Sequence, residues 1–227
     1  MDKKYYNSVS DLDLQRGGYY PEKIQFFEKN LTHLKKRFGR DLRILDIACN
    51  DGYLARVYSK YGSVSGIDLN EEAVKKAKTS GIDAVVADVF DIDTVFSGKK
   101  FDVIIAGDII EHVFDTDLFL KKIYAVLDMN GTVLLSTPNL VSLGRRIMTL
   151  FGKNPFCEFS AKKDGINVGH IRYYTFADLE KQLAETGFSM VKTESDTANL
   201  PIMFVDKFVV ALFPRLGREI LAKAHKL

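Results

Sequence analysis

A short apolar run at residues 42–48 ends in a turn of small residues, and a segment with helical spacing follows it. The run is typical of a buried β-strand, while Leu54, Val57 and Tyr58 recur on one face of a helix. Strand, tight turn and helix together form the βα unit from which parallel α/β sheets are built. Small residues are expected in such a turn because a ligand approaches its backbone closely. The rest of the chain is therefore expected to extend a parallel sheet.

The remaining sequence continues the alternation of strands and helices. Apolar runs predict further strands at 63–68, 84–87, 101–106, 132–136 and 188–194. Helical spacing and capping residues predict helices over 22–38, 71–79, 116–127 and 176–186. We expect an α/β fold of the Rossmann-like, doubly wound type, with a mostly parallel seven-stranded sheet whose last, antiparallel strand lies in 217–226. Ligands of such sheets bind beyond the carboxyl ends of the strands.

Composition narrows the classes of function. The net charge of +2 provides no concentrated basic face, so no nucleic-acid partner is expected. Cys49 and Cys157 are too few for a disulfide framework and fit a reducing compartment. The chain shows no apolar signal segment and no run of about 20 apolar residues, so no transmembrane segment is expected. These features predict a cytoplasmic protein.

The turn after the first strand argues against one class of cofactor. A dinucleotide-binding fingerprint requires glycine where this chain has Ala48, Asn50 and Tyr53. A tyrosine at the last of these positions would also block close packing of helix against strand. A nicotinamide-dependent oxidoreductase is therefore disfavoured.

The segment Asp46-Ile-Ala-Cys-Asn-Asp-Gly52 resembles the first motif of the class I S-adenosylmethionine (SAM)-dependent methyltransferases, which usually have glycine where this chain has Ala48 and Asn50. The branch that includes the ubiquinone-biosynthesis O-methyltransferases looks most similar. The Thr-Pro-Asn and His-x-x-x-Tyr-Thr segments are similar to those of relatives that modify sugars and cell-surface glycans. The resemblance covers roughly residues 40–195 and continues, in order, through Gly66–Asp68, Ala87–Asp88, Phe101–Ala106, Ile110–Val113, Ser136–Asn139 and Gly169–Phe176.

The resemblance implies SAM as cofactor and S-adenosylhomocysteine (SAH) as its product. In that family the first loop passes under the methionine part of SAM, and the acid at the position of Asp88 reaches the adenine amino group, with Val89 against the ring. Asp68 follows Asp46 by about 20 residues, where such folds place a carboxylate for ribose hydroxyls. The expected cofactor-binding residues are Asp46, Ala48, Cys49, Asn50, Gly52, Asp68, Leu69, Asp88, Val89 and Ala106. Of these, Cys49 is expected to be a small buried residue and not a nucleophile.

The whole chain, 1–227, is expected to form a single methyltransferase domain. Within the insertion that follows the fifth strand, Val141, Ile147 and Leu150 predict a short amphipathic helix. The expected parts are an N-terminal lid or helical segment at 1–39, a SAM-binding core at 40–138, a substrate-side insertion at 139–174 and the C-terminal part of the sheet at 175–227.

Four residues at the expected cleft are candidates for catalysis. If the segment after strand 101–106 is helical, Asp108, Glu111 and His112 share one face and could hold Mg²⁺ or Mn²⁺. The ubiquinone enzymes have a comparable cluster of acids and histidine. The alternative, which we favour over a metal, is a local role in which Asp108 caps a helix with Glu111 as its capping-box partner, or in which these side chains orient the acceptor. His170 lies on the segment expected to cover the acceptor and is a candidate general base.

The sequence therefore predicts a SAM-dependent methyltransferase that O-methylates a hydroxyl of a small molecule, a sugar or a lipid-linked glycan. Methylation of a nitrogen or carbon acceptor, and a non-catalytic SAM-binding protein, remain as alternatives. The sequence does not indicate an oligomeric state.

The C-terminal region contains the most apolar segment outside the expected sheet. Residues 202–213 carry three phenylalanines and form either a helix or a strand. A buried element is favoured over the alternative, a peripheral contact with a membrane through an apolar face bordered by basic residues. His33 and His225 lack supporting context and are expected at the surface.

Overall fold

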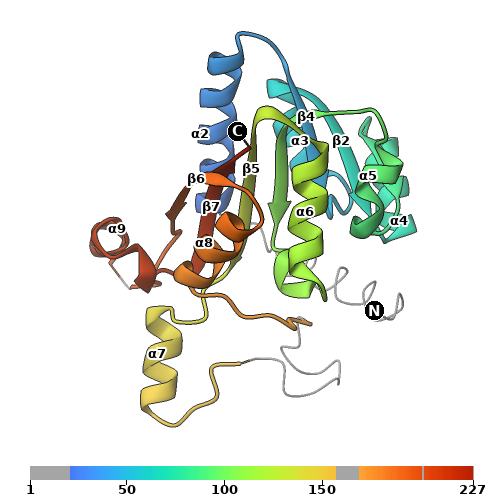
Figure 1. The fold of residues 1–227 in the computed structure, drawn as a ribbon. Coiled ribbons are helices and arrows are strands. Elements are labelled where there is room, and N and C mark those ends of the chain that lie inside the picture. The colour runs from blue at the N-terminus through green and yellow to red at the C-terminus, as the bar shows by residue number, and fades with distance from the viewer. Residues whose placement is uncertain (1–20, 157–168, 201, 227) are drawn as a thin grey trace.

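A computed structural model describes residues 21–156, 169–200 and 202–226 (Figure 1). The predictions for residues 1–20 and for Cys157 lie outside the described residues. Seven strands form one sheet in the order β3-β2-β1-β4-β5-β7-β6. They are β1 Leu42–Ile47, β2 Gly62–Asp68, β3 Asp83–Val86, β4 Phe101–Gly107, β5 Leu127–Pro138, β6 Ser189–Glu194 and β7 Glu219–His225.

The topology confirms the predicted mixed sheet. Strands β1 to β5 are mutually parallel, whereas β7 lies antiparallel between β5 and β6. In register, Asp46 on β1 is opposite Gly66 on β2 and Ile105 on β4. The parallel strands run downward in Figure 1, so their carboxyl ends meet at the lower edge of the sheet. We call this the carboxyl edge.

The helices begin and end close to the predicted positions. Asn70 caps α4 by accepting a hydrogen bond from the amide of Ala73, and Thr175 caps α8 in a capping box with Asp178. The helices are α2 Pro21–Phe38, α3 Tyr53–Tyr58, α4 Glu71–Thr79, α5 Ile92–Val95, α6 Thr116–Val126, α7 Leu143–Leu150, α8 Phe176–Glu185 and α9 Met203–Leu212. Four 3₁₀ turns complete the described elements: η1 Ser59–Tyr61, η2 Val89–Asp91, η3 Ile110–His112 and η4 Pro214–Leu216.

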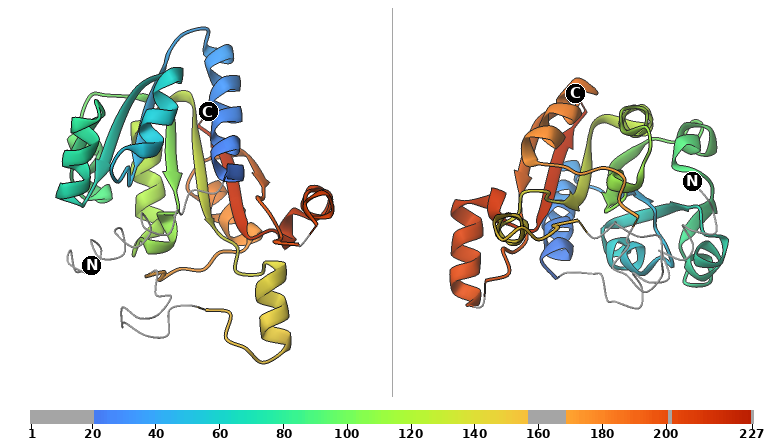
Figure 2. Two further views of the ribbon diagram at one scale, coloured as in Figure 1. Left: turned by 180° about the vertical axis from the view of Figure 1, so that it is seen from behind. Right: turned by 90° about the horizontal axis from the view of Figure 1, so that it is seen from below.

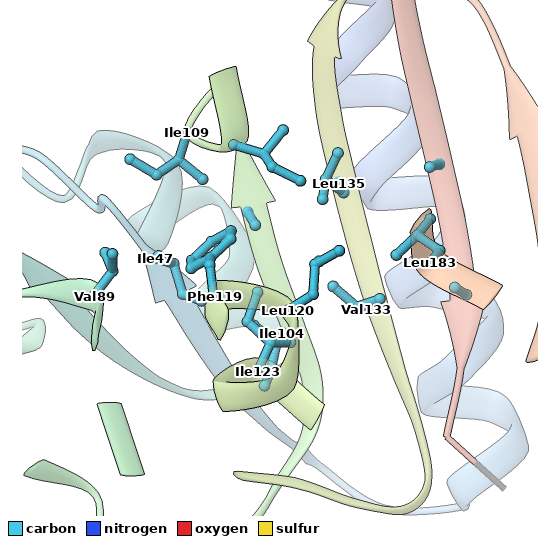
Figure 3. Packing of buried hydrophobic residues seen from close by; sticks show 14 of the residues in the cluster. Ile47, Val89, Ile104, Ile109, Phe119, Leu120, Ile123, Val133, Leu135 and Leu183 are labelled. Carbon is cyan, nitrogen blue, oxygen red and sulfur yellow. The ribbon is translucent and has the colours of Figure 1, made fainter. Parts of the chain in front are cut away.

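The core has two parts, one on each face of the sheet. On one face α6 packs Phe119, Leu120 and Ile123 against strand residues such as Ile104 and Val133 (Figure 3). On the other face α2, α3 and α4 cover the neighbouring residues of the same strands. Because successive side chains of a strand point to opposite faces, the apolar runs of the central strands supply both parts of the core. The sheet is therefore doubly wound, as predicted.

Three local predictions are wrong. The segment after β4 is only the single turn η3, so it offers no shared helical face, and the N-cap of that turn is Ile109 without a side-chain bond. His225 is buried and pairs with Thr132 Oγ1 at 2.9 Å, because β7 lies inside the sheet. Helix α9 is not a core element, since only Asp206 and Val210 among its residues are buried.

None of the helices in the described part of the chain is long and apolar enough to cross a membrane.

Candidate active site

The loop after β1 has the backbone conformation that its small residues predicted. Ala48, Asn50 and Gly52 all have positive φ, at 58°, 48° and 77°. The amide of Cys49 donates to the carbonyl of Ile67 on β2 at 3.1 Å, and the amide of Gly52 donates to the Cys49 carbonyl at 3.0 Å. These hydrogen bonds hold the turn against β2 at the point in the chain where α3 begins.

Two glycines allow this close approach. A Cβ on Gly66 would lie 2.6 Å from the Cys49 sulfur, and one on Gly52 would lie 3.0 Å from the Cβ of Ala77 on α4. Burial raises the pKa of the Cys49 thiol, with the charges of Asp46 and Asp68 acting in the same direction. Cys49 is therefore a buried thiol that stays protonated at neutral pH, and a side chain at Gly66 or Gly52 would crowd the loop.

Asp68 ties the ends of the first two strands together. Its Oδ2 accepts the amide of Asn50 at 2.9 Å, and its Oδ1 accepts the amide of Asn70 at 2.8 Å. Burial raises its pKa, whereas the amides of Asn70, Asn50 and Leu69 lower it. Each carboxylate oxygen can accept more than one hydrogen bond, so Asp68 retains capacity for a ligand hydroxyl.

The other predicted cofactor residues lie at the same edge. Asp88 follows β3, and its Oδ1 accepts the amide of Phe90 at 3.0 Å. Val89 is buried in the turn η2, Leu69 directly follows β2, and Ala106 is fully buried near the end of β4. The structure thus brings the predicted set together at the ends of β1, β2, β3 and β4.

Asp46 lies buried near the end of β1. Burial, together with the charge of Asp68, raises its pKa to about 7. Because the folded pKa is above the ordinary value of 3.8, the folded state binds a proton that the unfolded state releases between about pH 4 and 7. Stability contributed by this proton is present at low pH and is lost as the pH rises through that window.

We therefore expect Asp46→Asn to stabilise the ligand-free protein at pH 8. The amide carries no charge to desolvate, so the free energy of unfolding should rise by about 3 kcal/mol relative to the parent, and the gain should shrink towards zero near pH 4. Urea unfolding between pH 4.5 and 8 measures this difference. Parallel stability profiles for the two proteins would contradict the assignment.

A second group of side chains joins the loop after β4 to residues 169–172. The carbonyl of Glu111 accepts the amides of Ile171 at 2.9 Å and Arg172 at 3.1 Å. The Glu111 carboxylate is buried, and its Oε2 accepts a hydrogen bond from Thr137 Oγ1 at 2.9 Å. His112 Nδ1 donates to the carbonyl of Gly169 at 3.1 Å, which fixes the orientation of its ring. The segment after the insertion is thus held over the end of β4.

Glu111, His112 and His170 converge. His170 Nε2 lies 4.0 Å from Glu111 Oε1, and the two imidazole rings are 4.9 Å apart and tilted by 66°. One ligand atom from each residue lies within 4.8 Å of the others. Glu111 Oε1 is buried and has no hydrogen-bond partner among residues 21–156, 169–200 and 202–226. Two imidazoles and one carboxylate form a donor set that can hold a divalent cation or orient a hydroxyl.

The protonation of this cluster follows from burial. Burial lowers the pKa of His170 to about 3, and the charges of His112 and Arg145 act in the same direction. Burial also raises the pKa of Glu111 well above its ordinary value, and the charge of Asp108 adds to this. His170 is therefore a neutral imidazole at physiological pH, a form in which one ring nitrogen is a hydrogen-bond donor and the other an acceptor.

Asp108 belongs to a different network. Its backbone has φ of 51°, and its carboxylate binds the ammonium of Lys23 on α2 and accepts from Ser136 Oγ at 2.6 Å. Lys23 also pairs with Glu219 of β7 at 3.2 Å. Asp108 therefore does not join Glu111 and His112 as expected, because its left-handed backbone and the missing helix turn its side chain towards α2.

The sequence did not identify four residues that the structure places in these networks, namely Lys23, Ser136, Thr137 and Glu219. Burial alone would lower the pKa of Lys23, but the charges of Asp108 and Glu219 raise it above its ordinary value. Burial raises the pKa of Glu219 to about 8, and Asp108 acts in the same direction. One feature of the sequence could have indicated that Lys23 is buried. It precedes Phe27 by four residues, about one helical turn, and therefore lies on the buried face of α2.

Asn139 connects the site to the outer helices. Its side-chain amide donates to the carbonyls of Arg215 at 3.0 Å and Gly217 at 2.8 Å, just before β7. Its backbone forms a bridge with Tyr174, and it is fully buried. The chain before α7, the chain after α9 and the segment after His170 therefore meet at one side chain.

Comparison with known proteins adds the family context. A sequence model described as a methyltransferase domain matches residues 15–193. The chain is 35% identical over 120 residues to a ubiquinone biosynthesis O-methyltransferase of Bradyrhizobium diazoefficiens, covering 50% of this chain and 46% of that protein. A protein of the same name from Chelativorans sp. is 30% identical over 146 residues, covering 57% of this chain and 56% of its own length. The chain spans about half the length of these curated relatives.

Solved structures of similar fold cover nearly the whole chain. A SAM-dependent methyltransferase from Thermotoga maritima, described as a possible histamine N-methyltransferase, has a TM-score of 0.69 at 16% identity and covers 99% of this chain and 98% of its own. The plantazolicin methyltransferase, solved with SAH, has a TM-score of 0.69 at 16% identity and covers 97% of this chain and 90% of its own. At such low identity these similarities concern the fold alone.

Proposed function

This chain belongs to the class I SAM-dependent methyltransferases, and from that premise we propose that it methylates a hydroxyl group of a small molecule, a sugar or a lipid-linked glycan. The observation that carries the proposal is the convergence of Glu111, His112 and His170 at the carboxyl edge, with ligand atoms within 4.8 Å of one another. A hydroxyl acceptor needs a base or a cation to increase its nucleophilicity, and these side chains supply either. The similarity to O-methyltransferases of ubiquinone biosynthesis supports the same acceptor chemistry.

The residues around the first loop fit SAM. The positive φ angles of Ala48, Asn50 and Gly52 form a tight turn in which Ala48 and Asn50 remain partly exposed, so a ligand can approach the backbone there. Asp68 retains acceptor capacity for ribose hydroxyls, as argued above. A buried Asp46 with a raised pKa favours a cationic ligand nearby, since a positive charge stabilises its ionised form.

When bound, SAM supplies an activated methyl group and its own leaving group. The protein then needs to hold the acceptor in line and exclude water. We assign the first task to the segment at 169–174, which Glu111 and His112 fix by hydrogen bonds. We assign the removal of the hydroxyl proton to the neutral His170, whose Nε2 lies 4.0 Å from Glu111 Oε1.

A divalent cation at the same three residues is a second candidate for activating the hydroxyl. It is favoured by Glu111 Oε1, which has no hydrogen-bond partner in the described part of the chain. With two imidazoles and one carboxylate, the donor set suits Zn²⁺ or Fe²⁺ better than the Mg²⁺ or Mn²⁺ expected for two carboxylates and one imidazole.

The direct test is methyl transfer from SAM with a labelled methyl group to a panel of catechols, phenols, free sugars and polyprenyl-linked saccharides. The labelled methyl group should be recovered as a methyl ether of at least one hydroxyl compound. Amines and carbon nucleophiles in the same panel detect the alternative acceptors. Thermal shift with SAM, SAH and NAD accompanies the assay, because a ligand of the native state raises stability by mass action. Stabilisation by SAH without transfer to any hydroxyl compound would refute the O-methylation proposal and leave SAM binding intact.

Asp68→Ala should weaken SAH binding roughly 10- to 150-fold. Each charge-assisted hydrogen bond that the carboxylate makes to a ribose hydroxyl contributes on the order of 1.5–3 kcal/mol. Titration calorimetry with SAH measures the change. Asp83→Ala, which removes a mostly exposed acid at the start of β3, is the matched control and should bind as the parent does. Unchanged affinity in Asp68→Ala would remove Asp68 from the cofactor site.

A further inference from the structure

Helices α7 and α9 leave most of their apolar side chains in solvent. No residue of α7 is buried, and Leu150 and Phe151 at its end are 80% and 73% exposed. On α9, Met203 and Phe204 are 73% and 80% exposed, and Phe208 is 58% exposed. We call Leu150, Phe151, Met203, Phe204, Phe208 and Phe213 the α7–α9 surface. It is too apolar to be explained as an ordinary solvated face of the protein.

The exposed charges around this surface have one sign. In residues 143–156 and 202–217 the exposed charged side chains are Arg146, Lys153, Lys207 and Arg215. The single acid in these ranges, Asp206, is buried and accepts hydrogen bonds from Thr197 Oγ1 and from the amides of Ala198 and Leu200. The segment before α9 thus satisfies the Asp206 carboxylate with hydrogen bonds inside the protein, and the exposed charges within these two ranges are all positive.

The two helices lie on the same side of the molecule. Figure 1 and the view from below in Figure 2 show both beside β6 and β7, with α7 beyond the carboxyl edge of the sheet. They are also joined at their bases, because Asn139 before α7 bonds to the carbonyls of Arg215 and Gly217 after α9. The two helices that carry these apolar residues therefore lie on one side of the protein, with α7 beyond the carboxyl edge of the sheet.

We propose that the α7–α9 surface docks this protein on an anionic lipid bilayer. Helices that lie in a membrane interface combine exposed aromatic and aliphatic side chains with basic residues, and their attachment needs no spanning segment. The basic side chains match the negative charge of the lipid headgroups. A second copy of this chain matches the surface less well, because a two-fold contact of the patch with itself would gather the basic side chains of both copies in one interface, and the two segments offer no exposed acid to pair with them. The proposal does not depend on the acceptor, since binding to lipid can be measured without methyl transfer.

Co-sedimentation of the full chain with vesicles tests the proposal. The protein should sediment with vesicles of phosphatidylcholine containing one third phosphatidylglycerol, and several-fold less with phosphatidylcholine alone or at high salt. The double variant Phe204→Gln with Phe208→Gln should bind at least tenfold more weakly. Lys207→Glu with Arg215→Glu should lose about fivefold or more for each charge reversed.

Met129→Gln is the matched control. Met129 is 60% exposed but lies at the start of β5, at the opposite edge of the sheet, so its loss should leave vesicle binding unchanged. Thermal melting and SAH binding of each variant establish that it is folded. Absence of vesicle binding by the folded parent, or equal binding by the α9 variants, overturns the proposal. A concentration-dependent dimer that disappears in the phenylalanine variant while vesicle binding is absent would assign the surface to a second copy instead.

Discussion

Replacing His170 by asparagine is expected to slow methyl transfer by roughly 100- to 10,000-fold while SAH binding stays unchanged. The imidazole is kept neutral by burial, with its pKa lowered to about 3, and Nε2 lies 4.0 Å from Glu111 Oε1. Loss of this nitrogen removes either the group that takes the acceptor proton or one of three ligands of a cation. Single-turnover rates with the labelled methyl group measure the chemical step, and calorimetry measures SAH affinity. The hydrogen bonds described above for the first loop do not involve His170, so its replacement should change the rate of transfer and leave SAH affinity unchanged.

His225→Asn provides the control for His170→Asn. His225 is also a buried histidine whose pKa burial lowers, here to about 4, but it pairs with Thr132 at the other edge of the sheet. Its replacement should leave the rate unchanged. Addition of a chelator to the parent distinguishes the two roles, since a cation site loses activity and regains it with added metal, whereas a proton acceptor does not respond. Transfer at the parental rate by folded His170→Asn contradicts both roles.

Lys23→Met is expected to lower the free energy of unfolding by about 3–5 kcal/mol. The ammonium is buried beside the carboxylate of Asp108 and the carboxyl group of Glu219, and its removal leaves the partly exposed Asp108 carboxylate without its pairing cation. That loss is comparable to much of the total stability of an ordinary domain. Urea unfolding at pH 7 and 25 °C measures the change in midpoint, and the slope of the transition tests whether unfolding remains cooperative.

Two further variants show that the effect of Lys23→Met is electrostatic. Glu219→Gln should cost less than about 1 kcal/mol, because burial raises the pKa of Glu219 to about 8 and its side chain is already mostly protonated at pH 7. Adding Asp108→Asn to Lys23→Met should recover part of the stability, since no buried charge then remains unpaired. A loss below 1 kcal/mol in Lys23→Met would mean that water or movement of α2 compensates the charge.

The sequence predicted the tight turn after β1 and the grouping of acids at the carboxyl edge because these features are local. Asp46, Gly52 and Asp68 each follow or end an apolar strand, and parallel strands place such ends together whatever the rest of the chain does. The backbone at Ala48 and Asn50 could be anticipated because few side chains tolerate positive φ. These inferences needed only periodicity and the steric limits of a tight turn.

The acceptor side could not be predicted in the same way. The spacing of Asp108, Glu111 and His112 was interpreted on the assumption of a helix, but the positive φ at Asp108 turns it towards Lys23. The partners Lys23 and Glu219 come from opposite ends of the chain, and they meet only because β7 lies beside β5. Helix α9 is apolar enough for a core, and periodicity does not distinguish a buried apolar helix from an exposed one.

The bridge through Asn139 divides the protein into a constant part and an exchangeable part. Asn139 joins the segments that carry α7 and α9. Its side chain donates to the carbonyls of Arg215 and Gly217, and its backbone forms a bridge with Tyr174. The sheet and cofactor loop contribute nothing to the exposed faces of the two helices. Changes within residues 143–150 and 203–212 that keep Asn139 therefore leave this junction intact. In engineering terms, Asn139 is the residue at which grafts of the outer segments onto the sheet would be joined.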